Sequence, residues 1–204
     1  MSMRCVALSS MVLLIAALSI VPVVAQDAAP VRLRGTVSAV TGDQMTIATR
    51  EGGSAIVTLA ADAGLSAVQP VPLWAIKPGS FIGTAAAPDH DGVLTALEVV
   101  VFPDAMRGTG EGHYDWDLRP GSSMTNGTVD AVVEANSGKE LRLSFRGGSI
   151  KVQVPPNIPV VTIQPANRGD LTSGAAVFVV AQSRGGGLEA SRVVIGRNGV
   201  VPPM

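Results

Sequence analysis

The stretch GTVSAV, residues 35–40, returns later in the chain as GTVDAV, residues 127–132, and the two differ only at Ser38 and Asp130. An internal echo of this kind indicates that one structural unit occurs twice. The match continues downstream in the same order, pairing residues 44–65 with 140–160, residues 77–87 with 172–182, and residues 91–102 with 185–196. We therefore treat the chain after its first residues as two copies of one pattern.

Each copy shows the two-residue alternation that is typical of β-strands. Apolar side chains recur at every second position, as at Val37 and Ala39, at Met45 and Ile47, and at Leu141, Leu143 and Phe145. Successive side chains of a strand point to opposite faces, so each run buries one face and leaves the other polar. The glycine pairs at 52–53 and 147–148 predict hairpins between the second and third strands. Each copy therefore predicts about five strands.

Five short strands have to close on themselves in order to hide their edges. The composition suits a small core of aliphatic side chains, since 47% of the residues are hydrophobic but only 3% are aromatic. We predict an all-β protein, a tandem repeat of two small OB-like five-stranded β-barrels that follows an N-terminal signal peptide. The first barrel is assigned to residues 31–105 and the second to residues 127–199, with an inter-repeat strap at residues 106–126.

A proline-containing stretch follows the third strand of each copy, at residues 60–78 and 155–171. An OB barrel has its strand-crossing connection at this place. We expect that a short helix fits only in the first copy, because the prolines of the second disfavour one. Trp74 lies in the first connection, and we predict that it is buried as a plug at one end of the barrel. The alternative, a role in binding, would leave Trp74 exposed.

The opening MSMRCVALSSMVLLIAALSIVPVVAQD is typical of an export signal, with Arg4, an apolar run and small residues before Gln26. We expect cleavage after Ala25, which makes residues 1–25 the signal peptide; the alternative is an uncleaved membrane anchor. Cleavage removes Cys5, the single cysteine, and leaves 14 of the 15 basic residues against 16 acidic ones, a formal charge of about −2. Because no later apolar run is long enough for a membrane span, we expect a periplasmic or secreted protein.

The motifs of the two copies resemble those of a family of exported bacterial β-barrel domains that is catalogued as a domain of unknown function. The resemblance rests on the GTV-x-AV start, the Gly-Gly hairpin, the central PGS and the closing L-x-A-x-x-V. The segment from MRGTGEGHYDWDL at Met106 through SSMTNGTV is similar to a signature of the double-copy members. The resemblance implies an exported, all-β protein. Some similar proteins carry a metal-transporter label, which the lack of membrane spans does not support here.

The strap concentrates the polar and aromatic residues of the chain. Two sets of residues alternate in it, namely Glu111, His113, Asp115 and Asp117, and Gly112, Tyr114, Trp116 and Leu118. In an extended segment the two sets face opposite ways, so Tyr114, Trp116 and Leu118 are expected to pack between the repeats while the charged set is solvated. The competing hypothesis is a divalent-metal site made of His113, Asp115 and His90, since imidazole and carboxylate are common metal ligands.

Several function classes have little support in the sequence. Ser122 and Ser123 lie near His113, but without a G-x-S-x-G elbow, so we predict no enzymatic activity. The net negative charge and the few aromatic residues disfavour nucleic-acid binding. We therefore expect an exported, non-enzymatic binding or structural protein whose partner is a protein or a small ligand, with no cofactor unless the strap binds a metal. The alternative is a periplasmic divalent-metal-binding accessory protein that uses the His113 segment.

Overall fold

A computed structural model describes residues 29–135 and 138–204, which form twelve β-strands. The predicted signal peptide, residues 1–25, lies outside the described residues. The strands are β1 (Val31–Thr41), β2 (Gln44–Thr49), β3 (Ser54–Pro70), β4 (Phe81–Pro88), β5 (Leu94–Val101), β6 (Gly112–Asp115), β7 (Ser123–Ala135), β8 (Gly138–Phe145), β9 (Gly148–Val154), β10 (Val160–Pro165), β11 (Ala176–Arg184) and β12 (Gly187–Gly196). The predicted all-β class is confirmed. None of the helical turns within the described ranges has the length and apolar character of a membrane-crossing helix.

Barrel one consists of β1, β2, β3, β11 and β12. β1, β2 and β3 follow one another as antiparallel hairpins, β11 pairs with β1, and β12 pairs with both β11 and β3. The parallel β3–β12 ladder closes the ring, so all five strands have two neighbours. Alternate side chains, among them Met45, Ile47 and Val57, point inward and are completely buried. Small aliphatic groups are sufficient to fill a ring of this size.

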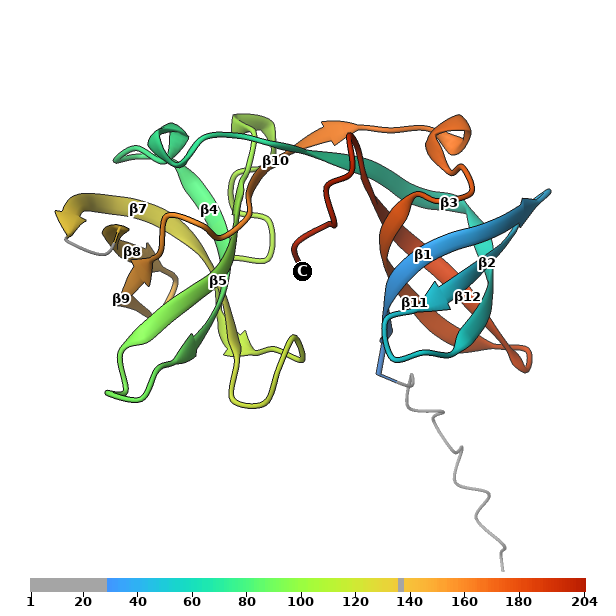
Figure 1. Ribbon diagram of the computed structural model, residues 1–204, viewed down its shortest axis with the longest axis horizontal. Coiled ribbons are helices and arrows are strands. Elements are labelled where there is room, and N and C mark those ends of the chain that lie inside the picture. Colours follow the sequence, from blue (N-terminus) through green and yellow to red (C-terminus); the bar gives the residue numbers. More distant parts are fainter. Residues whose placement is uncertain (1–28, 136–137) are drawn as a thin grey trace, which may run out of the picture.

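Barrel two consists of β4, β5, β7, β8 and β9. β7, β8 and β9 form consecutive hairpins, β4 pairs with β7 and with β5, and one parallel pair, Thr95 with Gln153, joins β5 to β9. Its interior is again aliphatic, with Ile82, Leu141 and Leu143 fully buried. Figure 1 shows the two barrels side by side.

The make-up of the barrels differs from the expectation that residues 31–105 and 127–199 each close a ring of their own. Strands β4 and β5 of the first copy complete the barrel of β7, β8 and β9, and strands β11 and β12 of the second copy complete the barrel of β1, β2 and β3. The two copies thus exchange their last two strands. Alternation along a strand shows which face is buried but does not show which partner strand covers it, so the sequence pattern left this exchange undetected.

The exchange follows from the length of β3, which runs through the predicted connection and spans 17 residues. Its first part pairs with β2, and the part beyond residue 60 carries the chain about 33 Å further, at roughly 3.3 Å per residue, towards barrel two. The second copy makes the same crossing with an interruption, because Pro155 and Pro156 end the ladder after β9 and the strand resumes as β10. Both crossing strands are visible between the barrels in Figure 1.

The two crossing strands pair with each other and form a bridge, residues 66–70 with residues 161–165. The pairing is antiparallel and runs from Ser66 opposite Pro165 to Pro70 opposite Val161, with Val68 opposite Ile163 at its centre. Val68 and Ile163 are also matched by the alignment of the two copies, so the bridge relates the barrels by an approximate twofold axis. A single-turn 3-10 helix follows each crossing strand, Leu73–Ala75 after β3 and Arg168–Asp170 after β10.

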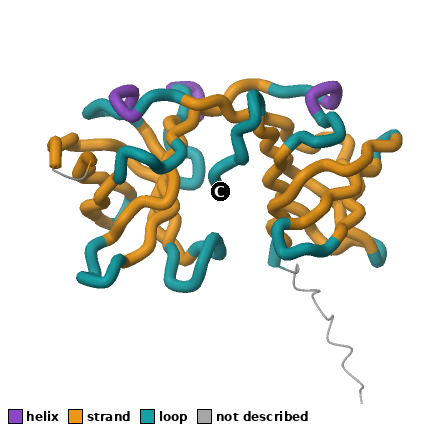
Figure 2. The backbone as a smooth tube through the Cα atoms, in the orientation of Figure 1, coloured by secondary structure: helices purple, strands orange, loops and turns teal. Residues whose placement is uncertain are grey.

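The helical turn of the second copy was not expected among its prolines. It begins beyond Pro165, where the Asn167 side chain accepts a hydrogen bond from the Gly169 N–H and the Asp170 carboxylate accepts one from the Asn167 N–H. This capping box stabilises the start of a helical turn that the prolines of the segment led us not to expect. The helical turns lie along the same edge of the molecule as the bridge (Figure 2).

The strand registers of the barrels agree in detail. The β1–β2 ladder shifts register between Val37 and Ala39, and the β7–β8 ladder shifts between Val129 and Ala131, the positions that the sequence alignment matches. The repeated stretch begins with a glycine for a steric reason. A Cβ atom on Gly35 would lie 2.1 Å from the Ala48 carbonyl oxygen, and one on Gly127 would lie 2.5 Å from the Ser144 carbonyl oxygen. Only glycine allows this close approach of two strands.

Candidate functional site

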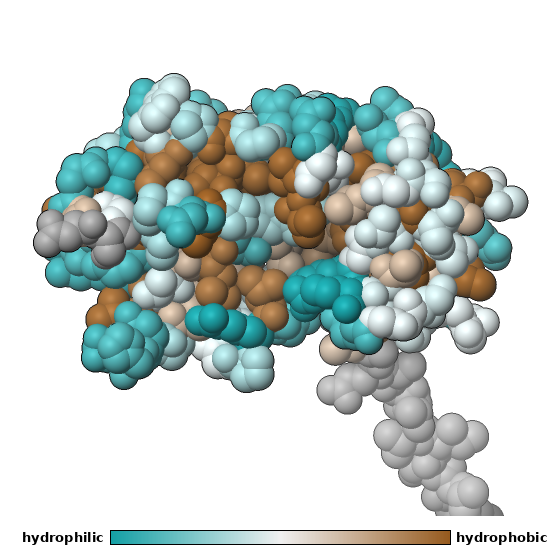
Figure 3. Space-filling view, in the orientation of Figure 1, coloured by the Kyte–Doolittle hydropathy of each residue, from teal (hydrophilic) through white to brown (hydrophobic). Residues whose placement is uncertain are grey.

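A cavity of about 650 Å³ lies between the two barrels. This interbarrel cleft is bounded by β1, β11 and β12 of barrel one, by β5 and β7 of barrel two, by Ser66 and Ile163 of the bridge, and by the strap. Figure 3 shows apolar side chains gathered in the hollow between the barrels, with hydrophilic residues around it. A volume of this size is typical of small-molecule binding sites.

The barrel-one face of the cleft is basic. Arg32 and Arg34 project from β1, with the Arg32 guanidinium 4.3 Å from the centre of the Trp116 ring and the Arg34 guanidinium 5.2 Å from that of Phe178. Both arginines share a single carboxylate, because Asp117 Oδ1 accepts from Arg34 at 2.7 Å and Asp117 Oδ2 accepts from Arg32 at 3.3 Å. Partial burial raises the pKa of Asp117, but the hydrogen bonds and charges of the two arginines outweigh it and lower that pKa.

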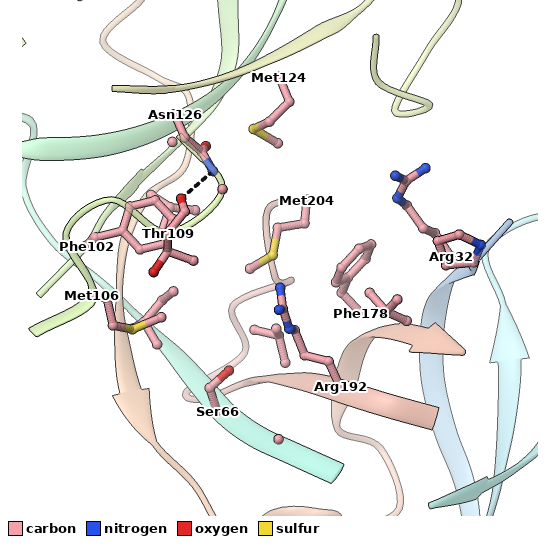
Figure 4. A pocket seen from close by; sticks show the side chains of 18 of the residues that line it. Arg32, Ser66, Phe102, Met106, Thr109, Met124, Asn126, Phe178, Arg192 and Met204 are labelled. Carbon is pink, nitrogen blue, oxygen red and sulfur yellow. Dashed lines mark hydrogen bonds between the residues drawn. The ribbon is translucent and has the colours of Figure 1, made fainter. Parts of the chain in front are cut away.

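Arg192, on β12, adds a further positive charge to this face. It forms no salt bridge within the part of the chain that the structure describes, and Figure 4 shows its side chain directed into the cleft. Its charge acts on Tyr114 of the strap. Partial burial raises the pKa of the Tyr114 hydroxyl, while the charges of Arg32 and Arg192 act to lower it. The charges of both arginines therefore act on the Tyr114 hydroxyl.

Apolar side chains predominate on the barrel-two face. Phe102, Met106 and Met124 line it, and Asn126 is only 7% exposed. The Asn126 Nδ2 donates to the Thr109 carbonyl at 3.1 Å (Figure 4), whereas Oδ1 has no hydrogen-bond partner. A Cβ atom on Gly83 would lie 2.5 Å from that oxygen, so glycine at this position leaves room for the amide.

Glu98 is a buried acid on β5, with 5% of its surface exposed. Burial raises its pKa to about 8, although the charges of Arg34 and Arg50 and the N–H of Met204 act in the opposite direction. Its Oε1 atom has no partner. The carboxyl of Glu98 is therefore mostly protonated at neutral pH, and it does not cancel the positive charge of the barrel-one face.

Unpaired polar atoms concentrate around the cleft. In residues 29–135 and 138–204 the buried side-chain atoms without a partner are Glu98 Oε1, Trp116 Nε1 and Asn126 Oδ1. Trp116 and Asn126 line the cavity, and Glu98 lies two residues before the lining residue Val100 on β5, on the same face of the strand. Buried polar groups are nearly always satisfied in folded proteins, so such a group of unsatisfied atoms indicates a place where a ligand or water completes the bonding.

The end segment, residues 197–204, lies between the barrels (Figure 1). Val200 and Met204 pack against the interbarrel cluster of Val68, Val100 and Phe178. The Arg34 Nε–H donates to the Met204 carbonyl oxygen, and Met204 forms part of the cavity wall. The segment therefore narrows the cleft and helps to fix Arg34.

The strap attaches to barrel two and contacts barrel one. Its strand β6 pairs with β7, while the Trp116 ring, beyond β6, lies 6.4 Å from the ring of Phe178 on β11 and 6.1 Å from that of Tyr114. Tyr114 and Trp116 both line the cleft. Leu118, which was grouped with them, is half-buried and belongs to none of the apolar clusters formed by the described residues.

The residues of the predicted metal site lie apart. His113 Nδ1 is 2.8 Å from the Thr125 hydroxyl, and its ring stacks on Phe145 at 5.9 Å. His90 lies in the exposed turn between β4 and β5, with Nε2 3.0 Å from a carboxylate oxygen of Asp91. Within the described ranges, ligand atoms of three residues approach within 4.8 Å of one another only at Asp89, His90 and Asp91. The structure therefore does not bring His90 to His113 and Asp115.

The structure also shows the surroundings of Trp74 and Ser122, for which the sequence raises expectations. Trp74 is 68% exposed, so the prediction that it plugs a barrel is wrong; its 3-10 turn lies outside the ring, and Ile76 is the residue that packs into the core. Ser122 is buried, and its hydroxyl lies 2.9 Å from the Trp116 carbonyl and 2.7 Å from the Arg119 carbonyl. This serine stabilises the turn before β7.

Sequence analysis missed the residues that distinguish the two faces of the cleft. A signal for them was present in the alignment of the copies, which matches Arg32 with Met124, Arg34 with Asn126, Phe178 with Gly83 and Arg192 with Glu98. These are the places where the copies differ in chemical kind within otherwise similar strands. Comparison of the chain with protein-family models, with curated proteins and with solved structures gives no match.

Proposed function

We propose that the protein is an exported, non-catalytic binding protein that holds a small, largely apolar ligand in the interbarrel cleft. The observation that carries this proposal is a cavity of about 650 Å³ with mostly apolar walls, on which buried polar atoms remain without partners. Specific small-molecule sites combine these properties, because apolar walls supply affinity and a few polar atoms supply orientation.

The location of the cavity supports the same conclusion. Each barrel interior is filled by its own core, in which Ile47 and Leu143 are fully buried, so the rings leave their binding surface on the outside. The exchange of strands ties the barrels together through the bridge ladder. A cleft between two units connected in this way is largely preformed, and a preformed site loses less free energy to ordering when a ligand binds.

The chemistry of the nearby nucleophiles favours binding over catalysis. Ser122 is committed to carbonyl groups of its own turn, and His113 is directed at Thr125. A catalytic serine requires a base within hydrogen-bond reach, and neither residue supplies one for the other. The export expected from the N-terminal segment would place this binding protein in the periplasm or outside the cell.

The uncharged dye Nile red tests the proposal. We expect the purified protein to bind about one dye per chain and the dye fluorescence to rise as it enters the apolar cleft. Ser66→Phe, which fills the cavity from the bridge, should lower the affinity at least tenfold, whereas Thr58→Phe, at an exposed position of the same strand, should leave it unchanged. Equal binding by both variants would show that the dye is held elsewhere. Native mass spectrometry of protein isolated from its own cells would identify a retained ligand.

The alternative proposal is a divalent-metal-binding accessory protein that uses His113, Asp115 and His90. It has less geometric support than the cleft, because His113 already contacts Thr125 and His90 lies with Asp89 and Asp91. A metal site built from the strap would require these side chains to leave their present partners.

A further inference from the structure

We infer that the ligand of the cleft is an amphipathic anion, with an acidic head group held by Arg192 and the Tyr114 hydroxyl and an apolar body packed against barrel two. This inference rests on the proposed function, because it names the chemical class of the molecule that occupies the cleft. It adds a direction to the site, with a charged end on barrel one and an apolar end on barrel two.

The charge of the barrel-one face favours an anion. Arg32 and Arg34 carry two positive charges and form salt bridges with one carboxylate, that of Asp117, while Arg34 also donates to the Met204 carbonyl oxygen. Arg192 adds a further positive charge, which has no salt-bridge partner in the described part of the chain. Arginine donates to carboxylates and phosphates in pairs of parallel hydrogen bonds, which makes such a head group the matching ligand.

Arg192 is exposed to solvent, like Arg142, but only Arg192 of the two lines the cavity. It lies on the wall of the cavity, and Figure 4 shows it between Phe178 and the bridge residue Ser66, directed inward. Its charge and that of Arg32 both act on the Tyr114 hydroxyl. A head group placed among these three side chains would meet two guanidinium groups and one phenol, which can all donate hydrogen bonds.

The opposite wall accepts an apolar chain. Phe102 and Met106 face the cavity from the barrel-two side, and the matched position of Arg32 there is Met124, which is only 6% exposed. Methionine side chains adapt their shape to a flexible chain. The unpaired Oδ1 of Asn126, which is nine-tenths buried on this wall, is available to a single donor on the ligand, such as a hydroxyl group.

The inference is tested by displacement of Nile red with dodecanoate and 1-dodecanol, which share a chain length and differ in head group. We expect dodecanoate to displace the dye from the wild-type protein at a concentration at least tenfold lower than dodecanol does, and dodecyltrimethylammonium to be the weakest of the three. Arg192→Gln should weaken dodecanoate about tenfold and leave dodecanol unchanged, because a charge-assisted pair is lost. Arg192→Lys should restore most of the preference for dodecanoate over dodecanol.

Arg142→Gln is the matched control, since Arg142 is an exposed strand arginine of barrel two that lies outside the cleft. It should change neither affinity. Equal displacement by dodecanoate and dodecanol, or equal behaviour of the two glutamine variants, would overturn the inference while the proposed function stands. Failure of Nile red to bind the wild-type protein would overturn the proposed function itself and the inference with it. High salt should weaken dodecanoate more than dodecanol, which provides an independent check on the charge.

Discussion

The two faces of the cleft are built on matched strands and carry opposite chemistry. Barrel one presents Arg32, Arg34, Phe178 and Arg192, and the alignment of the copies matches these residues with Met124, Asn126, Gly83 and Glu98 of barrel two. The backbone is the same on both sides, since Arg34 pairs with Phe178 in one barrel and Asn126 pairs with Gly83 in the other. The comparison shows that the scaffold is duplicated whereas the site is not.

The barrel interiors show the opposite relation, because matched positions there hold similar side chains. The copies match Val37 with Val129, Ala181 with Ala86 and Val193 with Val99, and each of these residues is buried in its own core. A closed ring of five strands has room for few side-chain volumes, so both interiors use similar small residues. The cleft-facing positions are free of this constraint, and their divergence is what gives the cavity one charged end and one apolar end.

The strongest test of the difference between the faces is to copy one into the other at Gly83. We expect Gly83→Phe, which introduces the residue matched at Phe178, to destabilise the fold by more than about 3 kcal/mol, because overpacking against fixed neighbours is costly. Any side chain at this position would begin 2.5 Å from Asn126 Oδ1 and 3.0 Å from Phe102. Urea unfolding followed by circular dichroism measures the change.

Ser38→Asp is the control for that substitution, because it copies the residue at Asp130 to an exposed matched position. It should change the free energy of unfolding by less than about 0.5 kcal/mol. If Gly83→Phe were as mild as this control, the two faces would be interchangeable and the argument for a one-sided site would fail.

The second test uses Glu98, the acid that barrel two carries where barrel one has Arg192. Its pKa is raised from 4.5 to about 8 by burial. The folded state therefore retains a proton that the unfolded chain releases between these pH values. The contribution of Glu98 to the free energy of unfolding is consequently fully present below pH 4.5 and is lost as the pH rises to about 8. The loss for the wild-type protein is on the order of 5 kcal/mol.

Glu98→Gln should remove this pH dependence, because an amide stays neutral throughout the range. We expect the variant to gain stability over the wild type progressively from pH 5 to pH 9, as measured by urea unfolding at each pH. Glu51→Gln, at an exposed glutamate of barrel one, provides the control and should give a profile parallel to that of the wild type. Parallel profiles for Glu98→Gln as well would mean that Glu98 reaches solvent.

Much of the fold was predictable from the sequence. The alternation of Met45 and Ile47 and of Leu141 and Leu143 identified strands that do lie at those places with those faces inward. The exchange of β4 and β5 for β11 and β12 was not predictable in this way, because it depends on whether β3 turns back after residue 60 or continues. Both outcomes bury the same side chains, and they are distinguished by the ladders between strands of different copies, such as β1 with β11 and β4 with β7, and by the bridge pairing of Val68 with Ile163.

The site was less accessible to sequence reasoning than the fold. The strap attracted attention because it gathers rare residue types, and Tyr114 and Trp116 do reach the cleft. Arg32 and Arg192 formed no part of the predicted site, because a charged residue on a strand is ordinarily expected to face solvent. Their significance arises from the arrangement of the barrels, which turns one outward face of each ring towards the other, and this arrangement follows from the strand exchange.

The third test compares the two tryptophans, of which one joins the faces of the cleft and the other does not. Trp116 packs against the interbarrel cluster and lies under the Arg32 guanidinium, so Trp116→Ala should lower the free energy of unfolding by about 2 kcal/mol. Trp74 is exposed, with the Lys77 ammonium 6.0 Å from its ring, and Trp74→Ala should cost less than about 0.5 kcal/mol.

Fluorescence sharpens the same comparison. In Trp74→Ala the remaining emission comes from Trp116, and we expect it to change when dodecanoate is added. In Trp116→Ala the emission comes from Trp74 and should be insensitive to the ligand. A response from Trp74 instead would move the binding site away from the cleft and towards the exposed turn of barrel two.

The smallest effect is expected from the strap histidine, which lies on the outer side of barrel two. His113 is held by Thr125 and Phe145, and His90 belongs to a separate exposed turn, so micromolar zinc or copper should leave the melting temperature unchanged and bind without saturation in a calorimetric titration. A chelating pair requires ligand atoms at distances of about 2 Å from one ion, and these side chains would have to abandon their present contacts to provide them.

Stoichiometric uptake that is lost in both His113→Ala and His90→Ala, with Nile red binding intact, would establish a second site on the strap and favour the metal-binding alternative. Uptake lost in His90→Ala alone would assign the ion to the turn of Asp89 and Asp91, where exposed carboxylates attract cations without a built site.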